Sequence, residues 1–188
     1  MTSGNELRHG RVLISEPFIE DPNFKRSVVF LTEHSDEMGS VGFVLNQRTD
    51  LAVNMVMEEL PGLTTSLFQG GPVELDRLNY LHSFESLDGA SEIIPGVYFG
   101  GKFESVLEGI NSNKYTADKI KFFVGYSGWA PGQLQVEIED KSWIIADLEA
   151  KDILDSDLVD NDLWKKAIKK SGGKNVLLVN SPDAPYLN

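Results

Sequence analysis

A block of small and aromatic residues, Gly125–Trp129, holds the best-defined candidate for chemistry in this sequence of 188 residues. It reads G-Y-S-G-W, and a serine beside glycine is typical of a nucleophile elbow, a sharp turn that exposes the hydroxyl between a strand and a helix. The second glycine of that motif falls at position 129, where Trp129 prevents the close backbone approach. The serine would also need a base, for which the sequence offers only His9, His34 and His82. The elbow is incomplete, so a serine hydrolase stays an alternative.

The same block has a second chemical interpretation, as an anion-binding turn. A glycine-rich turn from strand to helix leaves backbone amides free at a helix N-terminus, where they can hold an anion, and Gln133 could add a side-chain donor. The alternative is that the glycines only give Tyr126 and Trp129 room to pack in the core. We favour packing, because paired aromatics in a glycine loop more often pack than bind.

One segment has the residue spacing of a phosphate-binding loop but lacks the hydroxyl that such a loop needs. Gly96–Lys102 has the spacing of a phosphate-binding loop, but Phe103 stands where a hydroxyl should meet magnesium. We therefore interpret this segment as a buried strand that ends in a glycine turn. An anion-reading role for Arg26 or Arg77 competes with a structural ion pair, for which the many carboxylates supply partners.

Metal and cofactor chemistry have no pattern in the sequence. The chain has no cysteine, which excludes disulfides, thiolate nucleophiles, zinc ribbons and iron–sulfur ligation together. His34 and His82 lie far apart, and no H-x-x-x-H pair occurs. We expect no metal and no cofactor.

The charge is acidic and unevenly distributed. There are 17 basic and 29 acidic residues, for a net charge of -12. Residues 137–162 hold 10 acidic and 2 basic residues, and residues 163–188 hold 5 basic and 1 acidic. Lys165, Lys166, Lys169 and Lys170 follow acidic residues in the order that a helix dipole favours, which predicts a docked amphipathic helix with a solvated lysine face. We do not expect direct nucleic-acid binding, because an acidic protein is repelled by phosphates.

The elements that must position these residues alternate between hairpins and isolated helices, which predicts an α+β fold and no doubly wound parallel sheet. Strands are expected at Arg11–Ser15, Ser27–Glu33, Ser40–Asn46, Leu78–Phe84, Val97–Phe99, Lys119–Tyr126 and Trp143–Ala146. Helices are expected at Val53–Leu60, Phe103–Ile110, Pro131–Ile138 and from Asp160 through the lysines to Gly172. A long loop, His34–Gly39, would join the second and third strands, and Ser127–Ala130 would be a strand-to-helix loop.

The remaining composition is that of an ordinary globular protein. The N-terminus has no apolar segment of the signal-peptide kind, and no stretch approaches the 18 apolar residues of a spanning helix. We therefore expect a soluble cytoplasmic protein without membrane association. Residues 1–188 should form one domain, with 180–188 as an extended C-terminal tail.

Several longer motifs follow one another along nearly the whole chain. They include Gly10–Pro17 (G-R-V-L-I-S-E-P), Asp21–Val29 (D-P-N-F-K-R-S-V-V), Gly39–Asn46 (G-S-V-G-F-V-L-N), Gly70–Val73 (G-G-P-V) and Phe123–Leu134 (F-V-G-Y-S-G-W-A-P-G-Q-L). In this order they resemble the AlgH/YqgE family, a group of bacterial proteins of uncharacterised biochemical function. One departure is local: Asp155 stands where similar proteins often place an aromatic residue, which affects how the acidic segment packs.

The resemblance implies a fold but no chemistry. It implies an α+β domain with a bifurcated, mostly antiparallel β-sheet folded as a pseudo-barrel and helices packed outside. Some members carry the label of transcriptional regulator from genetic association, and the family offers no established catalytic residues to transfer.

Three functions remain open at this point. The first is a non-catalytic binding or regulatory module that acts through a protein or small-molecule partner, and we favour it over an enzyme. The second is an anion-binding protein or hydrolase whose site lies where three segments converge, Asp21–Ser27, Gly70–Val73 and Gly125–Gln133, so that Arg26, Ser127 and Gln133 line one pocket. The third is a transcriptional regulator that acts on DNA directly or through a partner. The candidate ligand-binding residues are Arg26, Ser27, His34, Asn46, Gly71, Pro72, His82, Tyr126, Ser127, Trp129 and Gln133.

Overall fold

The computed structural model describes residues 6–182. Its strands are β1 (Val12–Ser15), β2 (Val28–Ser35), β3 (Gly39–Val44), β4 (Arg48–Ala52), β5 (Ser66–Gln69), β6 (Val73–His82), β7 (Ala90–Ile94), β8 (Val97–Gly100), β9 (Ile120–Trp129) and β10 (Trp143–Ala146). Its α-helices are α1 (Val53–Val56), α2 (Phe103–Asn111), α3 (Gln133–Glu139), α4 (Ala150–Leu154) and α5 (Asp160–Ser171). Short 3₁₀ helices are η1 (Pro22–Phe24), η2 (Ala117–Lys119) and η3 (Gly173–Asn180).

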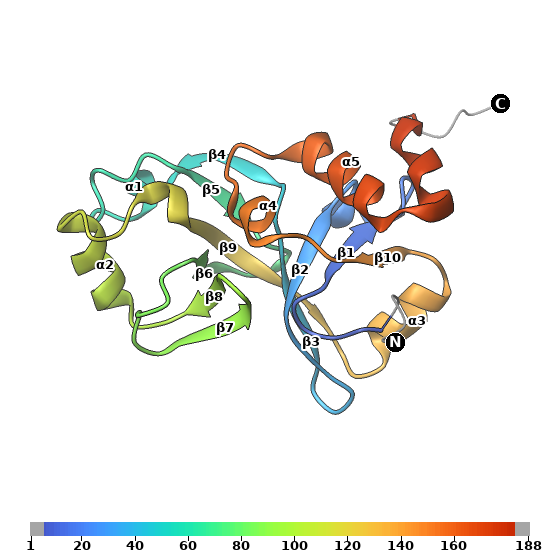
Figure 1. The fold of residues 1–188 in the computed structure, drawn as a ribbon, viewed down its shortest axis with the longest axis horizontal. Helices are drawn as coiled ribbons and strands as arrows, with labels where there is room; N and C mark the ends of the chain where they lie inside the picture. The colour runs from blue at the N-terminus through green and yellow to red at the C-terminus, as the bar shows by residue number, and fades with distance from the viewer. Residues whose placement is uncertain (1–5, 183–188) are drawn as a thin grey trace.

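The long strand β9 joins the two parts of the sheet (Figure 1). Its first half lies between β5, which runs parallel to it, and β6, which runs antiparallel. Its last residues pair with β3, and the sheet continues from there through β2 and β1 to β10, all antiparallel. On the other side β6 continues to β8 and β7. The sheet is therefore mostly antiparallel, bifurcates along β9 and curls into a half-barrel with helices outside, which confirms the α+β prediction.

Short helices cover the ends of the sheet: α1 and α2 lie at one end in Figure 1, and α5 with η3 lies at the other. The buried stripe of α5 consists of the predicted residues, Leu163, Trp164, Ala167 and Ile168. The Trp164 indole donates a hydrogen bond to the Ser15 carbonyl of β1 at 2.9 Å, which fixes the helix on the sheet. No helix within residues 6–182 combines the length and the apolar character that crossing a membrane requires.

The lysine face of α5 is only partly solvated, contrary to the prediction. Lys166 and Lys170 pair with the carboxylate of Asp152 on α4, at 2.7 and 3.0 Å, and Lys170 also reaches Glu149 at 2.9 Å. Asp152 is only 2% exposed, so this pairing offsets the cost of burying its charge. Two of the lysines that were predicted to face solvent therefore form ion pairs that join α5 to α4.

Several predicted boundaries are wrong, and the strand pairing gives the reason. The segment Ser127–Ala130 is not a loop: Ser127, Gly128 and Trp129 extend β9 because they pair with Ser40–Gly42 of β3, far away in the sequence. The prediction of a long loop at His34–Gly39 is also wrong, because β2 continues to Ser35 and β3 begins at Gly39, which leaves a short turn.

Other errors concern elements with weak patterns. Strands β4, β5 and β7 were not predicted. In β4 and β7, which have no buried residue, apolar and polar residues do not alternate regularly, so the sequence lacks the usual strand pattern. Helix α1 is shorter than predicted and ends at Val56. The predicted tail begins at the end of η3, while residues 183–188 lie outside the described residues.

Candidate functional site

A cleft of about 660 Å³ forms where three of the predicted segments meet. The connection from β1 to β2 contributes Asp21 and Phe24, the turn before β6 contributes Pro72, and the β9–α3 segment contributes Trp129 and Gln133. We call it the aromatic–acidic cleft. It is lined by Glu16, Phe18, Ile19, Glu20, Asp21, Phe24, Pro72, Gly128, Trp129, Gln133, Glu137, Asp140, Lys141, Ser142 and Trp143.

Three aromatic rings form one packed unit in this cleft. Phe24 stacks against Trp129 with ring centroids 6.0 Å apart and meets Trp143 edge-on at 5.3 Å. The two indoles meet edge-on at 5.9 Å. Trp129 ends β9 and Trp143 begins β10, so the sheet places both rings, and each is about 5% exposed or less. Such offset and edge-on pairs add to the stability that burial provides, so the unit is rigid.

The half-buried carboxylate of Glu137 ties the two tryptophans to α3. Both indole N–H groups donate to its Oε2, Trp129 at 2.9 Å and Trp143 at 2.8 Å. Gln133, one helical turn earlier, donates from its amide to Oε1 at 2.9 Å and accepts the Ala130 backbone N–H at 3.0 Å. The oxygen of Gln133 and one of its two amide N–H groups are therefore engaged within the protein, and the amide lies against a carboxylate, which does not suit the anion donor that the sequence suggested.

The electrostatic character of the cleft is strongly negative. Glu16, Glu20 and Asp21 come from the β1–β2 connection, and Glu137 and Asp140 come from α3 and the residue after it. Among the described residues that line the same cleft, Lys141 is the one with a basic side chain. Because like charges gathered in a concave surface raise the local potential, the cleft attracts cations and repels anions.

Ser127 lies in β9 and is completely buried. Its hydroxyl donates to the Gly70 carbonyl at 3.0 Å. Gly71 crosses directly over it: a Cβ there would lie 2.3 Å from the Tyr126 carbonyl carbon and 2.4 Å from Ser127 Oγ. Ser127 is therefore a packing residue that fixes the crossing, and the prediction that it shares a pocket with Arg26 and Gln133 is wrong.

Arg26, Ser27 and Asn46 come together at a different place, between β2, α5 and the C-terminal segment. Arg26 donates from Nη2 to the carbonyls of Ser181 and Pro182 at 2.6 and 2.7 Å. Asn46 accepts the Val28 N–H and donates to the carbonyls of Arg26 and Asp160, and Gln47 donates to the Ser27 hydroxyl. These contacts join the ends of distant segments, and none of the three residues lines the aromatic–acidic cleft.

The two histidines among the candidates are separate from the cleft and from each other. His34 Nδ1 contacts the hydroxyl of Ser40 at 2.8 Å, and that serine is only 4% exposed. His82 is buried; its Nδ1 accepts the Phe84 N–H, so Nε2 donates to the Gly100 carbonyl at 2.8 Å. Burial lowers the pKa of His82 and keeps the ring neutral. Within residues 6–182, no group of three or more acidic or histidine side chains is arranged to hold a metal ion.

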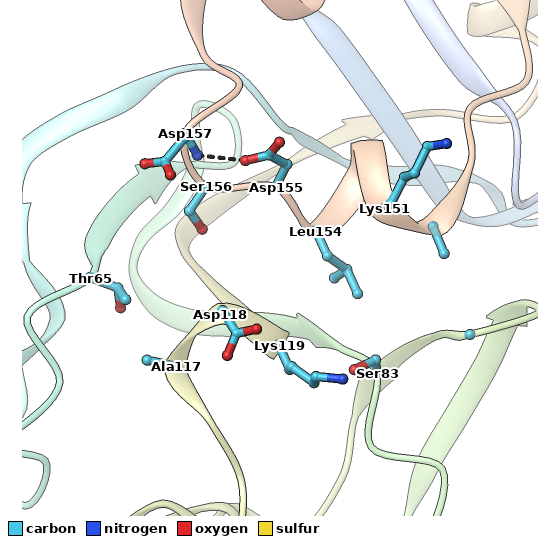
Figure 2. Close-up of a pocket in the computed structure, with 12 residues that line it drawn as sticks. Thr65, Ser83, Ala117, Asp118, Lys119, Lys151, Leu154, Asp155, Ser156 and Asp157 are labelled. Carbon is cyan, nitrogen blue, oxygen red and sulfur yellow. Dashed lines mark hydrogen bonds between the residues drawn. The ribbon is translucent and has the colours of Figure 1, made fainter.

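A second cleft, of about 650 Å³, lies beside α4 (Figure 2). One wall is formed by α4 and the connector that follows it, residues 155–157, and the other includes Thr65, Ser83 and η2. We call it the connector cleft. Asp155 does not present its carboxylate freely, because Oδ1 accepts the backbone N–H groups of Asp157 and Leu158 at 2.9 and 3.2 Å.

A buried lysine is hydrogen-bonded to the connector, residues 155–157. Lys121 of β9 is 1% exposed; its Nζ donates to the Asp155 carbonyl at 2.9 Å and lies 4.2 Å from the centroid of the Phe68 ring. Burial lowers the pKa of Lys121 to about 7. Arg48 adds a second bond, to the Ser156 carbonyl at 2.8 Å. The only sequence signal for Lys121 is a lysine within an otherwise apolar strand, and it was not predicted.

Proteins with similar sequences are known under family names. A family model described as AlgH-like matches residues 12–176. The UPF0301 protein CT0663 of Chlorobaculum tepidum is 35% identical over 183 residues, which is 97% of this chain and 96% of the relative. A UPF0301 protein of Cytophaga hutchinsonii is 40% identical over 184 residues, which is 97% of this chain and 100% of the relative. None of these names states a biochemical activity.

Solved structures match the fold over the same length. The solution structure of the AlgH protein from Pseudomonas aeruginosa has a TM-score of 0.71, 28% identity and 97% coverage of both chains. The crystal structure of protein DIP2367 from Corynebacterium diphtheriae has a TM-score of 0.78 at 24% identity, covering 95% of both chains. The half-barrel architecture is therefore shared, and the second match shows the fold alone.

Proposed function

Because the chain belongs to the AlgH-like family, we propose that it is a non-catalytic binding module that acts through the aromatic–acidic cleft. The family supplies no enzyme activity to carry over, so the proposal rests on the chain's own residues. A cytoplasmic location and an action through a protein partner are parts of the same proposal.

One observation carries it: three predicted segments converge on a cleft with a rigid aromatic unit and without a catalytic pair. Binding sites are typically concave, with aromatic side chains and a few fixed polar groups, and Glu137 is fixed by three hydrogen bonds. Among the described residues that line the cleft, no hydroxyl is hydrogen-bonded to a base. Ser127, the nucleophile of the incomplete elbow, is buried beside it.

The other functions find less support in the same residues. A hydrolase would need a serine that substrate can reach, and an anion site would need free donors where five carboxylates line the cleft. Direct DNA binding would bring phosphates against that same negative surface. A regulator that works through a protein partner remains within the proposal.

The test is a peptide selection read out at the tryptophans. The immobilised full chain is panned with a random peptide library displayed on phage, and the enriched peptides are titrated into ¹⁵N-labelled protein. We expect the indole N–H signals of Trp129 and Trp143 to shift. Trp164, which is buried under α5, is the internal control. Failure to enrich any peptide, or enriched peptides that leave both cleft signals unchanged, would overturn the proposal.

A further inference from the structure

We propose that the aromatic–acidic cleft docks an arginine-bearing segment of a partner protein. This inference rests on the proposed function and names the chemistry of the partner. Three properties of the cleft support it: its uncompensated charge, its aromatic surface and its size.

The charge of the cleft is not neutralised from within. Glu16, Glu20 and Asp140 have no ion pair with any basic side chain in residues 6–182, although ion pairs elsewhere tie several carboxylates to lysines and arginines. Glu137 receives its three hydrogen bonds from neutral groups, two indoles and an amide, and it has no ion pair within residues 6–182, so Lys141 in the cleft lining leaves its charge unpaired. A cationic partner therefore gains electrostatic attraction that the protein itself leaves unused.

The aromatic surface distinguishes between cations. Phe18 is 40% exposed at the cleft and Phe24 is half-buried, so both rings offer surface next to the carboxylates. A guanidinium group is planar, stacks on aromatic faces and presents a fork of donors that matches a carboxylate. A lysine ammonium can also lie over a ring, as Lys121 does over Phe68, but it is a compact, strongly hydrated charge without the planar fork that stacks and binds a carboxylate with two parallel bonds. The combination of ring and carboxylate favours arginine.

The size of the cleft favours a segment of polypeptide. A volume of about 660 Å³ is in the range that holds a drug-sized ligand, so one guanidinium leaves most of it unfilled. The remaining lining includes Ile19 and Pro72, which are suited to contact apolar side chains that flank the arginine. A charged anchor with flanking apolar contacts is typical of protein interfaces, in which arginine and aromatic residues dominate the binding energy.

The experiment uses a matched set of capped peptides with the full chain at low ionic strength. Each has two arginines among alanine and leucine residues; in one counterpart citrulline replaces arginine, and in another lysine does. Citrulline keeps the shape of arginine and removes its charge. We expect the arginine peptide to shift the Trp129 and Trp143 signals, the lysine peptide to bind several-fold more weakly, and the citrulline peptide about 10-fold or more weakly. Added salt should weaken the binding of the arginine peptide more than the binding of the other two peptides.

Two charge variants locate the contact. Glu20→Gln and Asp140→Asn should each weaken the arginine peptide about 3-fold or more, because both side chains are exposed and removing their charge leaves the fold intact. Glu58→Gln, which removes another exposed carboxylate that lies outside the cleft, is the control and should bind like the original chain.

The outcomes separate this inference from the proposed function. Equal binding of arginine and citrulline peptides, or selected peptides that occupy the cleft without any arginine, overturns the inference and leaves the binding function standing. Binding of free arginine amide as tight as the peptide's overturns the assignment to a protein segment. Selected peptides that bind away from Trp129 and Trp143 overturn the proposed function itself.

Discussion

The two clefts of this molecule are nearly equal in size and opposite in construction. In the aromatic–acidic cleft, neutral N–H donors hold a carboxylate whose charge stays available, and sheet-borne rings form the lining. In the connector cleft, the buried Lys121 and the exposed Arg48 each donate to a backbone carbonyl of the connector. The first cleft is lined by carboxylates that have no ion pair within residues 6–182, whereas the second, although Asp118, Lys119 and Lys151 also line it, has two cations bonded to its own wall.

The difference shows how little cleft size says about function. Lys121 bonds to a neutral carbonyl. No carboxylate bonded to its ammonium offsets the cost of removing the charge from water, so this buried charge lowers the stability of the fold. Glu137 also bonds only to uncharged groups, but its carboxylate is half-buried and accepts three hydrogen bonds, so its charge is better compensated than that of Lys121. Four substitutions test this contrast, from the largest expected effect to the smallest.

Trp129→Ala should lower the free energy of unfolding by about 3–5 kcal/mol, the range for truncating a buried aromatic side chain. It removes the ring that stacks on Phe24 and one of the donors to Glu137. Urea denaturation measures the change, and Val136→Ala, an exposed position on α3, serves as the control with little effect. A loss below 1 kcal/mol would mean that the aromatic unit is not rigid, and the contrast between the clefts would fail.

Lys121→Met should increase stability at pH 6, by about 1–4 kcal/mol, because it replaces a buried charge with an apolar chain. The pKa of Lys121 is about 7 in the folded protein and near its ordinary 10.5 when unfolded. Between these values the unfolded state binds more protons, so the original chain gains stability as pH rises from 7 to 10.5, loses it again as pH falls back to 7, and changes little below 7, where both states are protonated. The advantage of the variant should therefore shrink from pH 6 to pH 10.

The control for that profile is Lys119→Met, two residues earlier and exposed. Its unfolding free energy should keep the pH dependence of the original chain. If the two methionine variants show the same pH profile, Lys121 does not carry a buried charge. Hydrogen exchange at residues 155–158 gives a second readout, and it should accelerate in Lys121→Met only, because the bond to the Asp155 carbonyl is lost.

The sequence predicts the elements with strong local patterns and fails where distant pairing decides. The apolar stripe of α5 and the strand Trp143–Ala146 were predicted correctly because their periodicity is local. Ser127 and Trp129 were placed in a loop because their glycine neighbours suggest a turn, whereas pairing with β3 keeps them in the sheet. Three predicted segments do meet in one cleft, but its charge comes from acidic residues spread over two connections, and the motifs that contain Glu16 and Asp21 do not indicate that these side chains meet Glu137 and Asp140.

Glu137→Gln should lower the free energy of unfolding by about 1–3 kcal/mol, because hydrogen bonds to a charged acceptor are the stronger ones. A glutamine has only one acceptor oxygen where Glu137 has two. Its amide N–H₂ would therefore face an N–H donor that now bonds to the second carboxylate oxygen, and that donor would lose its acceptor. Urea denaturation again measures the loss, and Glu139→Gln, exposed on the same helix, is the control. The indole N–H signals of Trp129 and Trp143 should move together, because both bond to one oxygen.

Asp155→Ala should have the smallest effect, about 0.5–1.5 kcal/mol, the net value of an ordinary hydrogen bond. The Asp155 carboxylate accepts two backbone N–H groups of its own connector, so it acts as a turn acceptor. Asp155→Asn keeps an acceptor oxygen and removes the charge, which separates the two roles. If the turn explains the residue, asparagine should restore the slow hydrogen exchange of residues 157 and 158 that alanine loses. If asparagine behaves like alanine, the charge of Asp155 matters, and its carboxylate contributes to the connector cleft as a charge in addition to its role as a turn acceptor.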